Sequence, residues 1–107
     1  MDNTKLSIKD ITPYFELKGT FGYEQKKNRV SKIPIITFTT RFTDITDRVA
    51  RTLNQYTISY SYIKRNGFNQ IRISYPKNCL AFTNLLLEHM TIRTEIVKEM
   101  NTYCNKK

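Results

Sequence analysis

The stretch YTISYSYIKRNGFNQIRISYP, residues 56–76, decides the fold class. Two runs rich in β-branched and aromatic residues, 56–64 and 68–75, lie on either side of Asn66-Gly67. An Asn-Gly pair readily takes the positive φ angles of a tight hairpin turn, so the two runs are predicted to pair as antiparallel strands. Apolar and polar side chains alternate along the second run, which predicts one buried face and one free face.

A similar hairpin is predicted upstream. Residues 20–26 and 33–40 have the composition of strands, and the polar segment 27–32 joins them. Pro34 stands near the start of the second of these strands, where a missing N–H is best tolerated. The two hairpins together predict four strands.

Helices are predicted around these hairpins. An apolar stripe indicates a helix over residues 8–18, which Gly19 ends. Three further helices follow side chains that can cap an N-terminus: Thr43 or Asp44 for a helix through Asn54, Asn78 for one through His89, and Thr91 for one through about Tyr103. The last helix is expected to bury a stripe of Ile92, Ile96, Val97 and Met100.

These elements predict an α+β fold in the order α-β-β-α-β-β-α(-α), with a four-stranded antiparallel sheet covered by helices on one face. The chain of 107 residues is expected to form a single domain over 1–107, with its core at about 8–102, a short polar N-terminus and a basic C-terminal tail. The longest apolar run is three leucines, too short to span a membrane, and no signal or transit peptide is visible. We therefore expect a soluble, intracellular protein with no membrane partner.

The basic residues are segregated. The formal net charge is +9, and residues 18–41 and 64–77 carry +5 and +4 of it. Such clustering suits a surface that binds a polyanion, because each cation set against a phosphate releases a counterion. Charge kept only for solubility is the alternative. The predicted nucleic-acid contacts are Lys26, Lys27, Arg29, Lys32, Arg41, Lys64, Arg65, Gln70, Arg72 and Lys77.

Within that set, Gln70 and Arg72 are expected to contact base edges from the free sheet face, whereas the cations near the hairpin tips are expected to contact phosphates. Solvation of an exposed face is the alternative for both. Tyr56, Tyr60 and Tyr62 could stack on bases, although packing as sheet and core aromatics is favoured.

Familiar catalytic and metal-binding patterns are missing from the sequence. Cys79 and Cys104 lie in no CxxC pattern and no cluster of His surrounds them, so they are interpreted as reduced thiols and no metal site is predicted. His89 is interpreted as a structural residue near a helix end. The three glycines form no phosphate-binding loop.

The run ITPYFELKGTF, residues 11–21, resembles the nine-residue motif of the LAGLIDADG homing endonucleases. The segments that follow, PIITF at 34–38, RTL at 51–53 and IRIS at 71–74, resemble a single-motif unit of that family in order and spacing. The resemblance covers about residues 8–102. It implies a saddle-shaped sheet that straddles DNA, motif helices that pack together in pairs, and metal-dependent phosphodiester cleavage.

The resemblance also locates the catalytic position. The family's metal-binding acid precedes the motif glycine, and here that position is Lys18, which cannot ligate Mg²⁺. Glu16 stands two residues earlier, about 200° around a regular helix, and cannot simply replace it. Pro13 could begin a shortened motif helix after a Thr12 cap, or could mark a deletion.

We therefore expect a protein that binds double-stranded DNA, whose metal-dependent cleavage is lost or weakened and which needs no cofactor. A homodimer or a partner unit is expected through the helix at 8–18. One alternative is an RNA-binding or structural role, as a maturase or an organellar ribosome component. Another is residual Mg²⁺-dependent cleavage through Glu16 and a second carboxylate such as Glu24. The abundance of Asn, Lys, Ile and Tyr indicates an AT-rich genome, such as that of a mitochondrion, virus or phage.

Overall fold

The computed structural model describes residues 7–25, 27 and 32–106. Its elements follow the predicted order: α1 (Ile8–Lys18), β1 (Gly19–Gln25), β2 (Lys32–Thr40), α2 (Thr43–Gln55), β3 (Ser61–Arg65), β4 (Phe68–Ser74), α3 (Pro76–Leu87) and α4 (Thr94–Asn105). None of the helices in this part of the chain is long and apolar enough to cross a membrane.

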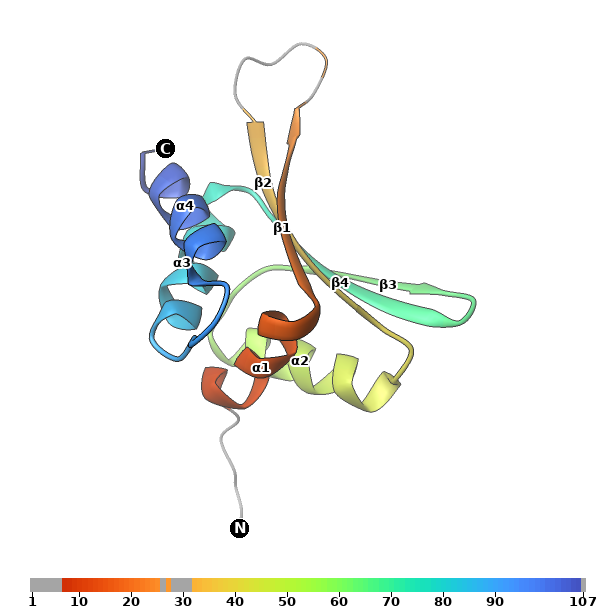
Figure 1. Ribbon diagram of the computed structural model, residues 1–107. Coiled ribbons are helices and arrows are strands. Elements are labelled where there is room, and N and C mark those ends of the chain that lie inside the picture. Colours follow the sequence, from red (N-terminus) through yellow and green to blue (C-terminus); the bar gives the residue numbers. More distant parts are fainter. Residues whose placement is uncertain (1–6, 26, 28–31, 107) are drawn as a thin grey trace.

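The four strands form one antiparallel sheet in the order β1-β2-β4-β3. The two hairpins point in different directions, and the helices gather on one side of the sheet, as Figure 1 shows. The sheet therefore has a helix-covered face and an open face, as the alternation in β4 predicted.

The core lies between the sheet and the helices. Ile36 of β2 and Ile71 and Ile73 of β4 are fully buried there. Phe15 of α1 meets them from the helix side, with its ring centroid 4.9 Å from that of Phe82 in α3. Burial of such side chains supplies most of the stability of a domain of this size.

Helix α1 has its full length and is not the short helix beginning at Pro13 that the sequence left as an alternative. It begins at Ile8, where the Asp10 carboxylate accepts a hydrogen bond from the Ser7 backbone N–H at 3.3 Å. Pro13 lies inside the helix, and the Thr12 hydroxyl donates to the carbonyl of Ile8 at 2.7 Å. The interpretation of Pro13 as the first helical residue after a Thr12 cap is therefore wrong.

The turn from α1 into β1 depends on Gly19. A Cβ atom at this position would lie 2.8 Å from the carbonyl oxygen of Phe15 and 3.0 Å from its Cα. The φ of Gly19 is −72°, so the glycine is required by this close approach of the backbone and not by a left-handed conformation.

The third strand is shorter than predicted. It begins at Ser61 and not at Tyr56, because Thr57 takes a φ of +58° and the N–H of Ile58 bonds to the carbonyl of Leu53. These contacts hold residues 56–58 against the end of α2, and residues 58–60 run on without a strand partner.

The predicted caps are wrong as well. Thr43 and Asp44 lie inside α2, Asn78 lies inside α3, which begins at Pro76, and Thr91 precedes α4 by three residues. Their side chains make other contacts: the Thr43 hydroxyl faces the Asn69 amide at 3.4 Å, and the Asn78 amide donates to the carbonyl of Ser74 at 3.1 Å.

The apolar stripe of the last helix is only partly buried. Val97, Met100 and Cys104 enter the core, whereas Ile92 and Ile96 are exposed. Helix α4 begins two residues later than predicted, after Arg93 in a left-handed conformation, so Ile92 lies in the connection before the helix and not on its buried side.

Candidate nucleic-acid interface

The open face of the sheet is a surface of hydroxyl, aliphatic and a few charged side chains. The strand register groups these side chains in five rows that cross the strands. The residues of this face are Thr20, Gly22 and Glu24 of β1, Ile33, Ile35, Thr37 and Thr39 of β2, Phe68, Gln70, Arg72 and Ser74 of β4, and Ser61, Ile63 and Arg65 of β3. In the described part of the chain the helices lie on the other side of the sheet (Figure 1), so this face can meet a large partner without a change of fold.

The two residues predicted to contact bases both lie on this face and hold defined positions. The Arg72 guanidinium forms an ion pair with the Glu24 carboxylate at 3.5 Å. The Gln70 amide donates to the Thr39 hydroxyl at 3.2 Å. Both interactions are exposed. An exposed ion pair stabilises the fold little, so Arg72 can exchange its Glu24 partner for a phosphate or a base edge at low cost.

The other predicted contacts that the structure describes are exposed and come from several elements. Arg65 is exposed at the tip of the β3–β4 hairpin, on the open side, while Lys64 is exposed beside it on the other side. The remaining exposed cations are Lys27 in the β1–β2 turn, Lys32 at the start of β2, Arg41 after its end and Lys77 in the first turn of α3. Lys26 and Arg29 lie outside the described residues.

Glu16 has a role that the sequence did not reveal. Its carboxylate is buried, with 9% of the residue exposed, and Oε2 accepts hydrogen bonds from the backbone N–H groups of Thr91 and Ile92 at 2.6 and 3.0 Å. The Thr91 hydroxyl donates to the same oxygen at 3.2 Å. These donors lower the pKa of Glu16, chiefly the Thr91 N–H. Glu16 therefore fixes the α3–α4 connection to α1.

Arg93 completes this connection. Its guanidinium donates to the carbonyl oxygens of Phe15 and Glu16 at 3.3 and 3.0 Å, and so binds two of the last carbonyls of α1. The same guanidinium lies 5.9 Å from the centre of the Phe21 ring. The end of α1 is therefore held by protein groups on its buried side.

The residues at this end of α1 do not fit a divalent metal. Lys18 is exposed at the position of the expected ligand and would repel a cation. The Glu16 carboxylate is committed to Thr91 and Ile92, and Glu24 lies on the open face beside Arg72. Within the described ranges, no three His, Cys, Asp or Glu side chains come together. The pairing of Glu16 with Glu24 as metal ligands therefore has no geometric support.

An apolar patch flanks the exposed side of α1. Leu17 is 74% exposed and Phe42, just before α2, is 58% exposed. Between them lies a hollow of about 160 Å³ that Tyr14 and Ile45 also line. Large exposed apolar side chains that adjoin one another are characteristic of interaction surfaces.

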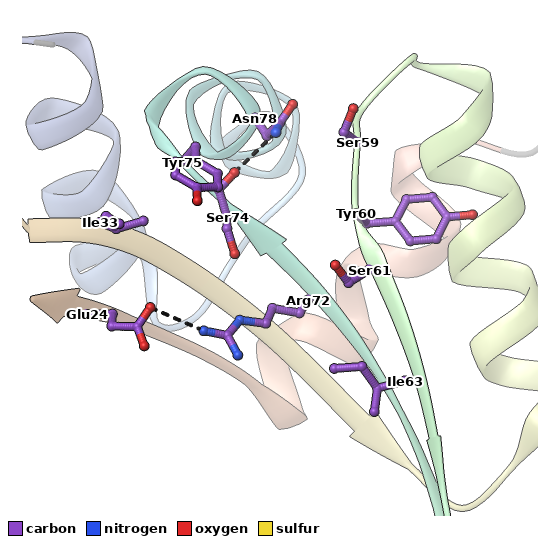
Figure 2. A pocket seen from close by; sticks show the side chains of 10 residues that line it. All are labelled: Glu24, Ile33, Ser59, Tyr60, Ser61, Ile63, Arg72, Ser74, Tyr75 and Asn78. Atoms are coloured by element: carbon purple, nitrogen blue, oxygen red, sulfur yellow. Dashed lines mark hydrogen bonds and ion pairs between the residues drawn. The ribbon is translucent and has the colours of Figure 1, made fainter. Parts of the chain in front are cut away.

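A second hollow, of about 510 Å³, opens where β3 and β4 diverge. Figure 2 shows Ser59 and Ser61 on one side and Ser74, Tyr75 and Asn78 on the other, with the Arg72–Glu24 ion pair below them. Tyr75 was not singled out from the sequence, although the residue before a proline is biased away from helical conformations and so marks a turn.

The tyrosines and His89 occupy ordinary positions. Tyr60 and Tyr62 pack against the core, and the Tyr62 hydroxyl donates to Asp47 at 3.2 Å, whereas Tyr56 is exposed. His89 is exposed in the turn after α3, and its backbone N–H bonds to the carbonyl of Leu86. Cys79 and Cys104 are buried free thiols.

No protein-family model matches this sequence, and no curated protein matches it either. Solved structures do match the fold. The homing endonuclease I-CvuI in complex with the I-CreI target superposes with a TM-score of 0.75 at 10% identity, over 92% of this chain and 66% of that one. The LAGLIDADG homing endonuclease I-GzeII in complex with its DNA target gives 0.75 at 13% identity, over 94% of this chain and 36% of that one.

An archaeal intron-encoded homing endonuclease, I-Vdi141I complexed with DNA, gives a TM-score of 0.73 at 13% identity, over 92% of this chain and 66% of that one. The chain has the LAGLIDADG homing-endonuclease fold, as the motif at residues 11–21 predicted. It spans under two thirds of the length of I-CvuI and just over one third of that of I-GzeII.

Proposed function

We propose that this protein binds double-stranded DNA on the open face of its sheet and does not cleave it by the metal-dependent route of the homing endonucleases. The observation that carries the proposal is the open face itself, which presents Arg72, Gln70 and Arg65 on a fold that the structural neighbours use in complexes with DNA. A twisted antiparallel sheet of this size can enter the major groove, where side chains such as Arg and Gln read base edges.

The loss of cleavage is supported by the end of α1. Hydrolysis of a phosphodiester at a metal centre needs carboxylates that hold the ion at the scissile phosphate. Lys18 supplies a cation there instead, and Glu16 already accepts three hydrogen bonds from Thr91 and Ile92. A lysine at this place is suited to neutralising a phosphate that stays intact.

Pairing of two units through α1 is the second part of the proposal. Exposed Leu17 and Phe42 lie at one end of α1, and one unit alone would cover only part of a duplex site. Sedimentation of the wild type should show a dimer, and Leu17→Glu, which sets a charge in the apolar patch, should give a monomer with an unchanged fold. A monomeric wild type would contradict this part.

The DNA-binding proposal is tested by titrating a labelled duplex over a series of salt concentrations. The Arg65→Ala/Arg72→Ala double variant should lower affinity by about 10-fold or more and flatten the dependence of log K on log salt. Arg51→Ala is the control, because Arg51 is exposed on α2, on the helix side of the sheet. Equal losses for the two variants would contradict an interface on the open face.

Two additions to the same experiment test the remaining claims. Products run on a denaturing gel after incubation with Mg²⁺ should show intact strands, and nicked strands would contradict the loss of cleavage. A structured RNA titrated in parallel should bind more weakly than the duplex. Tighter binding to the RNA would favour the RNA-binding alternative over the proposed function.

A further inference from the structure

The hollow between β3 and β4 has the features of a small binding site. It arises because β3 pairs with β4 only from Ser61 onward, while residues 58–60 run away from Ser74 without pairing. Its volume of about 510 Å³ falls within the range of pockets that hold small organic groups. Ser61, Arg72 and Ser74 belong both to the hollow and to the open face, so a ligand on the face has direct access.

The lining offers both polar and aromatic contacts. In the described part of the chain the hydroxyls of Ser59, Ser61 and Ser74 make no side-chain hydrogen bond to protein, so each is available as donor and acceptor. The Asn78 amide nitrogen is bonded to the carbonyl of Ser74, which orients its oxygen as a further acceptor. These are groups that can satisfy the edge of a nucleobase.

Tyr75 supplies the aromatic surface. Half of it is exposed, and its backbone has φ 78° and ψ 147°, close to a region that glycine alone occupies readily. The N–H of Tyr75 donates to the carbonyl of Pro34 and its own carbonyl accepts from the N–H of Cys79, so the unusual backbone is fixed from both sides. Strained residues of this kind concentrate at binding sites. Tyr60 also lines the hollow, but its ring turns toward α2 (Figure 2).

We propose that this hollow receives one unpaired nucleotide of a DNA bound on the open face, with its base stacked on Tyr75 and its phosphate near Arg72. The inference rests on the proposed function and adds a substrate class to it: duplexes that carry a bulged or extruded base. An unpaired base enters such a pocket at little cost, since no base pair or stack has to be broken.

The test compares two duplexes of about 30 base pairs, one fully paired and one with a single unpaired adenine. Stacking of a base on an aromatic side chain corresponds to a gain of about 5- to 150-fold in affinity, so the wild type should prefer the bulged duplex by a factor in that range. Tyr75→Gly should abolish the preference while leaving the affinity for the paired duplex unchanged. Tyr75→Phe is the matched control and should keep the preference.

Thermal unfolding separates this role from a purely structural one. Glycine is at ease at a φ of 78°, so Tyr75→Gly should unfold at a midpoint no lower than that of Tyr75→Phe. Equal affinity of the wild type for both duplexes, or a preference that survives Tyr75→Gly, would overturn the inference and leave the proposed function standing. Failure to bind either duplex would overturn both.

Discussion

Replacement of Gly19 by alanine tests how α1 is joined to the sheet. The added Cβ would lie 2.8 Å from the Phe15 carbonyl oxygen and 3.0 Å from the Phe15 Cα, and these backbone atoms cannot turn aside as a side chain could. Phe15 is fully buried between Phe38 and Phe82, at ring distances of 5.3 and 4.9 Å, so a shift of its backbone is transmitted to the core. Overpacking of this kind costs about 1–3 kcal/mol.

For a domain of about this size, each kcal/mol lowers the thermal midpoint by roughly 4–8 °C, so Gly19→Ala should unfold about 5–20 °C below the wild type. Circular dichroism at 222 nm, followed on heating and in urea, measures this. Gly22→Ala is the control: a Cβ there meets nothing within 4 Å, so the midpoint should stay unchanged or rise, because alanine restricts the unfolded chain. A Gly19→Ala midpoint equal to that of the wild type, or an equal fall in both variants, would refute the steric argument.

Three further predictions concern the buried side of the fold. Glu16→Gln should destabilise the protein at neutral pH. Because the pKa of Glu16 lies below its ordinary 4.5, the difference in unfolding free energy between wild type and variant should be constant above about pH 5 and should vanish as the pH falls through the lowered pKa. A difference that does not depend on pH would contradict this. Burial raises the pKa of Cys79 to about 12 and that of Cys104 above its usual value, so a thiol reagent at pH 8 should modify neither cysteine until urea is added; rapid labelling of the folded protein would refute this. Ile71→Ala should lower the free energy of unfolding in urea by about 2–5 kcal/mol, whereas Ile63→Ala, on the open face, should lower it by less than half as much. Equal losses would contradict the placement of Ile71 in the core and Ile63 on the open face.

The order of the elements could be predicted because it depends on local signals. Asn66-Gly67 fixes a hairpin through its turn geometry, and the alternation in β4 places Ile71 and Ile73 on the covered face and Gln70 and Arg72 on the open one. These features involve residues close in sequence, so periodicity alone reveals them.

The start of α1 at Ile8 was predicted correctly, but the starts of α3 and α4 could not be predicted in this way. Thr91 looks like a helix cap, but its N–H and hydroxyl bond to Glu16, 75 residues earlier in the chain. Tyr56 to Tyr60 look like a strand, but the bond from Ile58 to Leu53 and the left-handed Thr57 hold this segment to the end of α2. A contact between distant residues determined the first outcome, and a local backbone turn determined the second. Composition carries no signal of either.

The candidate site shows the same division. The face that carries Arg72 and Gln70 followed from alternation. The ion pair of Arg72 with Glu24 depends on β1 lying two strands away from β4, and the hollow beside Tyr75 depends on how β3 and α3 adjoin β4. The commitment of Glu16 to the α3–α4 connection became visible only once the fold had brought these segments together.

The most direct test of the open face as the DNA interface is a methyl NMR titration of isoleucine-labelled protein with a duplex. Ile35 and Ile63 lie on the open face, whereas Ile92 and Ile96 are exposed on the helix side of the molecule. The resonances of Ile35 and Ile63 should shift or broaden as duplex is added, while those of Ile92 and Ile96 stay in place. Shifts confined to Ile92 and Ile96 would contradict the account.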